Sequence, residues 1–220
     1  MAISANAIIE SQLASIDNST GSTTPYKNWF LENCMPDDVA KELRTLPFEA
    51  PELEGISGKR ELHNKTRTYF DVPNMERYPV CKAFNEAFQS TDITNKIQDF
   101  FGTNLDGTYL RVEYAQDIDG FWLEPHTDLG VKAFTMLLYI SDEPSHAALG
   151  TDYYNADKSH AGRSPFKANS AFVFVPSDIT YHGFETRKIA GIRKSIIINY
   201  VTDEWRAREQ LAFEQSPIKG

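Results

Sequence analysis

The stretch 191-GIRKSIIINYV-201 decides the fold, because its β-branched core is typical of a buried strand. Three further runs of the same kind precede it: YLRVEYAQ (109–116), FTMLLYIS (134–141) and SAFVFVPS (170–177). Clusters of Gly, Pro, Asp and Ser separate these runs, as expected for short strands joined by loops. The second half of the chain is therefore predicted to form a β-sandwich or barrel.

The first half of the chain has mainly helical patterns. PDDVAKELRTL (36–46) opens with Pro and two Asp, and VCKAFNEAFQS (80–90) and ITNKIQDFFG (93–102) follow, the last closed by Gly102. TRTYFDV (66–72) is rich in strand-forming residues and predicts an early strand. Helices followed by a run of strands indicate an α+β fold with helices backing one face of the β-structure.

The N-terminal residues 1–25 are predicted to be a peripheral arm. Residues 4–16 have the spacing of a short amphipathic helix, and the polar stretch DNSTGSTTP follows them. This helix is a candidate dimer contact and equally a candidate disordered arm. Residues 26–220 are predicted to be one domain, with helical support over about 26–107 and a barrel core over about 108–202.

Composition limits the functions that the chain can have. The 31 acidic and 22 basic residues give a net charge of −9, which argues against nucleic acid as a partner. No apolar stretch is long enough to span a membrane, and Glu10 interrupts the N-terminal run where a signal peptide would continue. Two distant cysteines make no disulfide framework. We expect a soluble, cytoplasmic protein.

The segment FWLEPHTDLG (121–130) contains a candidate metal site. His126 and Asp128 are two residues apart, so on a strand both project from one face. An HxD pattern alone is a weak signal, and such an ion needs a third ligand. His182 follows a predicted strand and is our candidate, with His146 and His160 as competitors. Two His and one carboxylate with open positions suit a non-haem Fe(II) oxygenase.

Arg193 and Ser195 alternate onto one face of the last predicted strand. An Arg that points into a barrel must find an anion, and its planar fork matches a carboxylate. A structural ion pair or an exposed strand position would also explain Arg193. Lys194 could serve the same carboxylate, but alternation turns it to the opposite face from Ser195.

Together, HTD (126–128), the distant His182 and RKS (193–195) closely resemble the HxD…H…RxS pattern of the iron(II)/2-oxoglutarate dioxygenase superfamily, and the lead-in LRVEYAQDIDGFWLEPHTD (110–128) is similar to its prolyl-hydroxylase-like members. The resemblance covers about residues 108–202. It implies a double-stranded β-helix, the jelly-roll or cupin-like barrel.

The same resemblance implies cofactors and roles. Fe(II) would be held by His126, Asp128 and His182, and the distal carboxylate of 2-oxoglutarate by Arg193, Ser195 and the hydroxyl of Tyr114. With O2 as second co-substrate, decarboxylation of 2-oxoglutarate would be coupled to hydroxylation. A core position with its hydroxyl bound to backbone explains Tyr114 equally well.

The prime substrate is not specified by these motifs, because the barrel sets the chemistry and the loops set selectivity. A small molecule is favoured, and a peptidyl residue is compatible. Thr151 is a candidate lining residue, and the candidate substrate contacts are Arg111, Trp122, Tyr153 and Arg163. Two other functions compete: a cupin-like metal enzyme that uses no 2-oxoglutarate, which leaves Arg193 and Ser195 without a role, and a non-catalytic binding module.

Overall fold

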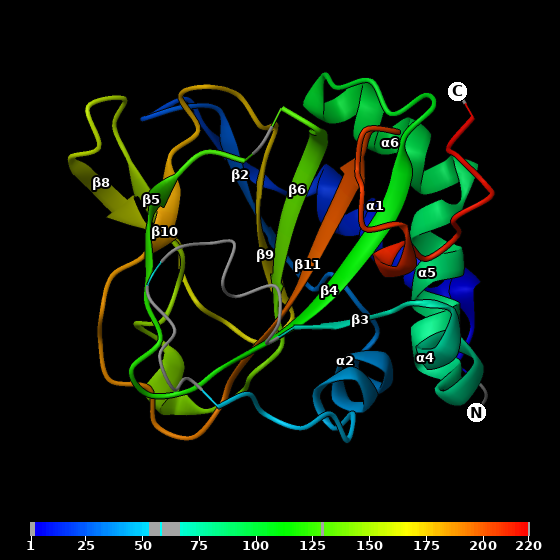
Figure 1. Ribbon diagram of the computed structural model, residues 1–220, viewed down its shortest axis with the longest axis horizontal. Helices are drawn as coiled ribbons and strands as arrows, with labels where there is room; N and C mark the ends of the chain where they lie inside the picture. Colours follow the sequence, from blue (N-terminus) through cyan, green and yellow to red (C-terminus); the bar gives the residue numbers. More distant parts are fainter. Residues whose placement is uncertain (1–2, 53–57, 59–66, 129, 220) are drawn as a thin grey trace.

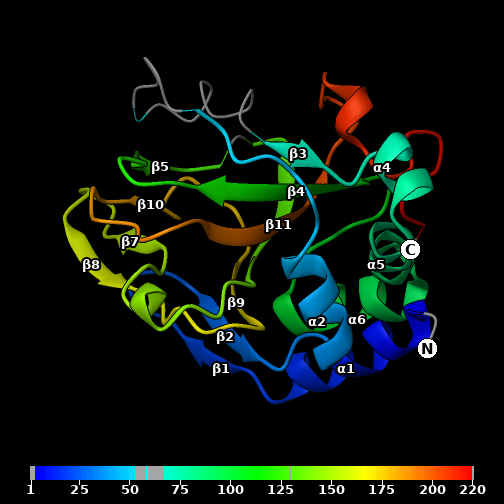
Figure 2. The same cartoon turned by 90° about the horizontal axis from the view of Figure 1, so that it is seen from below.

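Three layers are stacked in the protein: a small sheet, a large sheet and a group of helices, which lie from left to right in Figure 1. The computed structural model describes residues 3–52, 58, 67–128 and 130–219. Figure 2, turned by 90°, shows the same helices gathered on one side of the large sheet. The predicted arrangement of helices backing one face of the β-structure is confirmed.

The large sheet has seven strands in the order β1-β2-β9-β6-β11-β4-β3, and all neighbours are antiparallel. The strands are β1 (Thr20–Ser22), β2 (Asn28–Glu32), β3 (Thr68–Tyr69), β4 (Tyr109–Asp117), β6 (Lys132–Tyr139), β9 (Ser170–Phe174) and β11 (Arg193–Val201). The four runs predicted from sequence are β4, β6, β9 and β11. They form the middle of this sheet.

The small sheet has four strands in the order β5-β10-β7-β8. They are β5 (Leu123–His126), β7 (Asp152–Tyr154), β8 (His160–Arg163) and β10 (His182–Phe184). From β4 onward the chain passes back and forth between the two sheets, which is the winding of a jelly roll, so the predicted fold is confirmed. Among the described residues no strand pairs across the two sheets, so the jelly roll is an open sandwich and not a closed barrel.

Both faces of the central strands are buried. On the helix side, Val112, Ile196 and Met136 belong to one apolar core together with the helices. On the other side, Leu137, Tyr139 and a group of phenylalanines form a second core between the sheets. Alternation along each strand therefore sends successive side chains into two different interiors.

The helices are amphipathic and pack their apolar faces on the large sheet. They are α1 (Ala5–Asp17), α2 (Asp37–Arg44), α4 (Val72–Arg77), α5 (Pro79–Gln89) and α6 (Thr91–Phe101), with two short 3-10 turns, η2 (Pro144–His146) and η3 (Arg208–Gln210). Gly102 ends α6 at a positive φ of 72°, a left-handed conformation that favours glycine, as the sequence predicted. The predicted helices at 36–46, 80–90 and 93–102 are confirmed.

The expectation of a peripheral N-terminal arm needs correction. α1 buries Ile8 and Ile16 in the helix-side core and packs against α5 and α6, while β1 extends the large sheet. The sequence misleads because the polar stretch after Ile16 resembles a linker, although Thr20–Ser22 pairs with β2.

The region before α5 also differs from the expectation. The predicted strand at 66–72 is reduced to β3, and its first residue, Thr66, lies outside the described residues. Asp71 instead caps α4, accepting a hydrogen bond from the backbone N–H of Asn74 at 3.0 Å. A capping Asp followed by Val-Pro begins a helix where the β-branched composition indicated a strand.

In the part of the chain that the structure describes, no helix combines the length and apolar character needed to cross a lipid bilayer. Cys34 and Cys81 are both buried and free, in agreement with the absence of a disulfide framework from the sequence.

The packing of α1 can be tested with two neighbouring residues. Ile8 is fully buried, whereas Ile9 is only partly buried. Ile8→Ala should lower the free energy of unfolding by about 3 kcal/mol because it leaves a core cavity, and Ile9→Ala by about 1 kcal/mol. Urea denaturation measures both. Equal and small losses would mean that α1 does not belong to the core.

Candidate active site

Two strands of the small sheet bring the candidate metal ligands together. His126, at the end of β5, lies directly opposite His182, at the start of β10, in the antiparallel ladder. Their ring centroids are 4.4 Å apart. Asp128 follows β5 by two residues, and one ligand atom from each of the three side chains lies within 4.8 Å of the others. A pairing between segments 56 residues apart therefore creates a three-residue cluster.

The two imidazoles are oriented by their own backbone. Nδ1 of His126 lies 2.8 Å from the carbonyl oxygen of Glu124, and Nδ1 of His182 lies 3.0 Å from that of Thr180. A carbonyl can only accept, so each Nδ1 is the donor in this contact, and Nε2 is the ring nitrogen that could ligate an ion. Metal-binding histidines ordinarily donate their other ring N–H to a carbonyl or carboxylate in this way.

The carboxylate of Asp128 is buried and held by two donors. Lys132 donates to Oδ1 at 2.6 Å, and the Thr135 hydroxyl donates to Oδ2 at 2.6 Å. Both donors lie on β6, so the large sheet positions a ligand that the small sheet supplies. The donor set of two imidazoles and one fixed carboxylate fits a divalent transition metal such as Fe(II).

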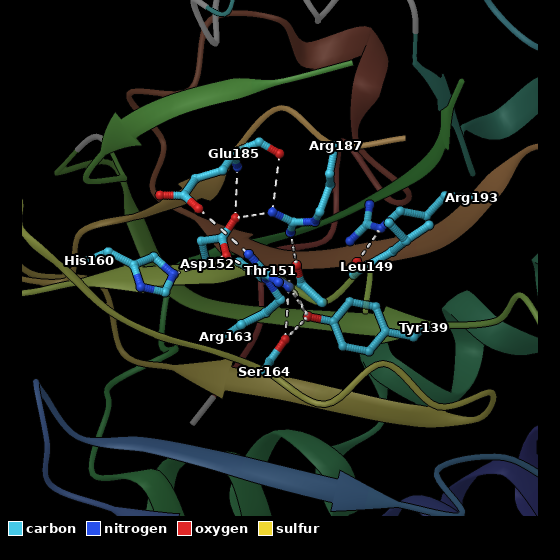
Figure 3. Close-up of polar contacts among 11 residues, drawn as sticks. Tyr139, Leu149, Thr151, Asp152, His160, Arg163, Ser164, Glu185, Arg187 and Arg193 are labelled. Carbon is cyan, nitrogen blue, oxygen red and sulfur yellow. Dashed lines mark hydrogen bonds and ion pairs between the residues drawn. The ribbon is translucent and has the colours of Figure 1, made fainter. Parts of the chain in front are cut away.

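The competing histidines lie elsewhere. His146 is buried, and its Nε2 donates to the carbonyl of Ala190 at 2.7 Å. His160 lies beside Asp152 and Glu185 in a second cluster on the small sheet (Figure 3). Asp152 there already pairs with Arg163 and Arg187, at 2.7 Å and 2.6 Å. Two guanidiniums neutralise this cluster, so its chemistry is that of a structural ion pair rather than a metal site.

A pocket between the sheets opens beside His126, Asp128 and His182. Alternate residues of the central strands line it, as their shared face requires. Its described lining residues are Arg67, Arg111, Glu113, Ala115, Asp117, Phe121, Leu123, His126, Asp128, Lys132, Thr135, Leu137, Thr151, His182, Gly183, Phe184, Arg193, Ser195 and Ile197.

Arg193 and Ser195 both line this pocket, on the predicted face of β11. Nε of Arg193 donates to the carbonyl of Leu149 at 2.7 Å, a contact drawn in Figure 3. Nη1 donates to the carboxylate of Asp117. The guanidinium also lies 4.8 Å from the Phe184 ring centroid. Lys194 points the other way and donates to the carbonyl of Arg44, as alternation predicts.

The structure does not bring Tyr114 to this pocket. Tyr114 is on β4 opposite Ile196, so its side chain faces the helices, and its hydroxyl donates to the carbonyl of Leu43 at 3.0 Å. The residues on either side of it, Glu113 and Ala115, face the pocket. Strand alternation excludes Tyr114 from the site and leaves it as a core residue.

Only some of the candidate substrate contacts line the pocket. Thr151 and Arg111 line the pocket. Trp122 is 39% exposed, Arg163 pairs with Asp152, and Tyr153 stacks on Phe172, and none of these three is among the described lining residues. Tyr139, which motif reasoning missed, supports Thr151 through a hydrogen bond of 2.8 Å between the hydroxyls (Figure 3).

A buried chain of alternating charges forms one wall, and motif reasoning missed most of it. It runs Arg193–Asp117–Arg67–Glu113–Arg111. Burial raises the pKa of Asp117, but Arg67 and Arg193 outweigh this and hold that pKa below its usual value. Glu113 shows the same balance: burial raises its pKa, and Arg111 and Arg67 lower it further. Both carboxyls are ionised at neutral pH.

The fold is shared with solved 2-oxoglutarate oxygenases. A prolyl 4-hydroxylase from Pseudomonas putida matches with a TM-score of 0.56 and 14% identity, over 89% of this chain and 93% of that one. A prolyl hydroxylase from Trichoplax adhaerens, solved with a peptide of a hypoxia-inducible factor, matches with a TM-score of 0.55 and 12% identity, over 92% and 93%.

A third match is HygX from Streptomyces hygroscopicus, solved with nickel and 2-oxoglutarate bound, with a TM-score of 0.51 and 14% identity over 89% and 88% of the two chains. No protein-family model and no curated protein matches the sequence. At such identities the likeness establishes the jelly-roll fold alone.

The charge chain gives a testable acid dependence. Because the folded-state pKa values of Asp117 and Glu113 lie below the unfolded values of about 4, their stabilisation is complete above pH ~5 and is lost as the pH falls through the folded values. Asp117→Asn should lower the free energy of unfolding at pH 7 by about 3 kcal/mol. Between pH 7 and pH 3, the free energy of unfolding should fall less in this variant than in wild type, as measured by urea denaturation at each pH. An equal decrease in the two proteins would contradict this prediction.

Proposed function

We propose that the protein is an Fe(II)- and 2-oxoglutarate-dependent dioxygenase that hydroxylates a small-molecule or peptidyl substrate. The observation that carries this proposal is the cluster of His126, Asp128 and His182 in one pocket with Arg193. Each imidazole has its Nδ1 engaged by backbone, so Nε2 is the ring nitrogen that would bind the ion. The shared fold with 2-oxoglutarate oxygenases supports the same interpretation.

In this proposal the bound iron supplies the oxidising chemistry by activating O2 together with 2-oxoglutarate, whose decarboxylation accompanies hydroxylation. The protein's own side chains would orient 2-oxoglutarate and neutralise its charge. Arg193 receives the distal carboxylate of the co-substrate, and Ser195 adds a hydroxyl donor on the same face of β11. Asp117 fixes Nη1 of Arg193 and the carbonyl of Leu149 fixes Nε, so the guanidinium is oriented before the co-substrate arrives.

The first test is an anaerobic titration with Fe(II) and then 2-oxoglutarate, followed by the visible charge-transfer band that chelation of iron by a 2-oxo acid produces. We expect the band in wild type. Arg193→Ala should raise the apparent dissociation constant for 2-oxoglutarate by about tenfold or more, since a charge-assisted pair is lost, while iron binding is kept. Asp117 retains Arg67 as a partner in this variant.

Arg44→Ala is the matched control, because Arg44 forms a partly exposed ion pair with Asp142 outside the pocket. It should leave the band unchanged. Iron binding with no band at saturating 2-oxoglutarate would instead support a cupin-like metal enzyme and remove the carboxylate role of Arg193.

The third ligand is tested by a pair of histidine variants. His182→Ala should lower the affinity for Fe(II) by orders of magnitude, because two protein ligands remain of three. His160→Ala removes a histidine from the neutralised cluster at Asp152 and should bind iron as wild type does. Calorimetric titration under argon measures both. Loss of iron binding in His160→Ala with retention in His182→Ala would reverse the assignment.

A further inference from the structure

Among the described lining residues of the pocket, the charges do not balance once the iron and 2-oxoglutarate sites are filled. Its described lining contains four basic side chains, Arg67, Arg111, Lys132 and Arg193, and three carboxylates, Glu113, Asp117 and Asp128. A divalent cation and the dianion 2-oxoglutarate cancel each other, so one positive charge remains in excess. An uncompensated charge in a desolvated site is unfavourable, and a monoanionic ligand removes the imbalance.

The other three cations each have a partner or an assigned role. Arg111 lies between the rings of Tyr69 and Trp205, with centroids at 4.8 Å and 4.7 Å. Its three nitrogens all donate, to the side chains of Gln210, Asn199, Tyr69 and Glu113. Lys132 donates to Asp128, and Arg193 is assigned to 2-oxoglutarate. The excess charge is therefore best met at Arg67.

Two of the three guanidinium nitrogens of Arg67 pair with described carboxylates. Nε lies 3.2 Å from Glu113 and Nη1 lies 2.7 Å from Asp117. The Phe121 ring covers it, with the centroid 5.3 Å from the guanidinium carbon. The side chain is 6% exposed and lines the pocket, and its Nη2 has no hydrogen-bond partner among the described residues. An N–H pair so placed is preorganised for an anion.

We propose that Arg67 binds a carboxylate of the prime substrate, which is a small carboxylic acid. This inference rests on the proposed oxygenase function. A carboxylate carries the single negative charge that the loaded pocket lacks, whereas a phosphate monoester carries nearly two at neutral pH. The rigid Arg67 would hold that acid beside the metal cluster, and Glu113 and Asp117 act as positioning residues for Arg67.

The test uses the full chain loaded anaerobically with Fe(II) and 2-oxoglutarate, so that ligands bind without turnover. Calorimetric titration is carried out with a set of 2-hydroxy and aromatic monocarboxylic acids, each paired with its primary amide, and with phosphate monoesters of matching size. We expect at least one acid to bind, and its amide to bind about tenfold more weakly or worse, because the charge-assisted hydrogen bond is lost.

The responsible arginine is identified by a conservative variant. Arg67→Lys keeps a cation beside Asp117 and Glu113 but removes the free N–H pair, so the affinity for the acid should fall by about tenfold while that for 2-oxoglutarate, followed by the charge-transfer band, stays within about twofold. Arg44→Lys, outside the pocket, should change neither. The comparison of acid with amide in wild type needs no variant and stands even if Arg67→Lys unfolds.

Several results would overturn the proposal: equal binding of acid and amide, binding of a phosphate monoester in preference to every acid, or no binding of any acid by a protein that shows the 2-oxoglutarate band. Unchanged acid affinity in Arg67→Lys would do the same. Weakened 2-oxoglutarate binding in that variant would make Arg67 a co-substrate group instead. Absence of the band in wild type is a different failure, because it removes the proposed function itself.

Discussion

The structure depends on the burial of both faces of β4, β11 and β6. One face packs on the helices and must be apolar, while the other faces the pocket and the small sheet. Since side chains alternate along a strand, each residue is committed to one interior or the other by its register alone. A shift of one residue in β11 would send Arg193 into the helix-side core and Ile196 into the pocket.

On the pocket face of β4, this constraint buries charged side chains. Arg111, Glu113 and Asp117 occupy alternate positions of β4 and are all at least 90% buried, so each needs a counter-charge within the protein. Arg67 supplies two of these contacts by bridging Glu113 and Asp117. Ion pairs thus link Arg193, at one end of this pocket wall, to Arg111 at the other end. Each inner member of the wall has two partners of opposite charge, so Asp117 keeps Arg67 when Arg193 is removed, and Glu113 keeps Arg67 when Arg111 is removed.

Sequence patterns were sufficient for the long elements and for the cluster of His126, Asp128 and His182, because periodicity and the HxD spacing are local signals. They were insufficient wherever partners are far apart in the chain. Alternating charges along β4 look like a solvent-facing strand, and the burial of Glu113 follows only from the sheet packed against it. Strand alternation already predicts that Tyr114 and Glu113 face opposite ways. The prediction that Tyr114 contacts 2-oxoglutarate followed the family motif instead, and it did not take this alternation into account. The integration of α1 depends on pairing between β1 and β2, which no local pattern specifies.

The position of Arg111 has a consequence for the order in which the protein can fold. Three of its partners, Asn199, Trp205 and Gln210, are made about ninety residues or more after it. During synthesis the guanidinium must stay hydrated until they emerge, so the wall containing Glu113 cannot close around a dry interior early. Backbone contacts from residues 211 to 218 then fasten this end of β4, with Ala212 and Ile218 donating to the carbonyls of Leu110 and Thr108. The pocket wall is therefore complete only after the C-terminal residues have been made, although the strand that forms it is made halfway through the chain.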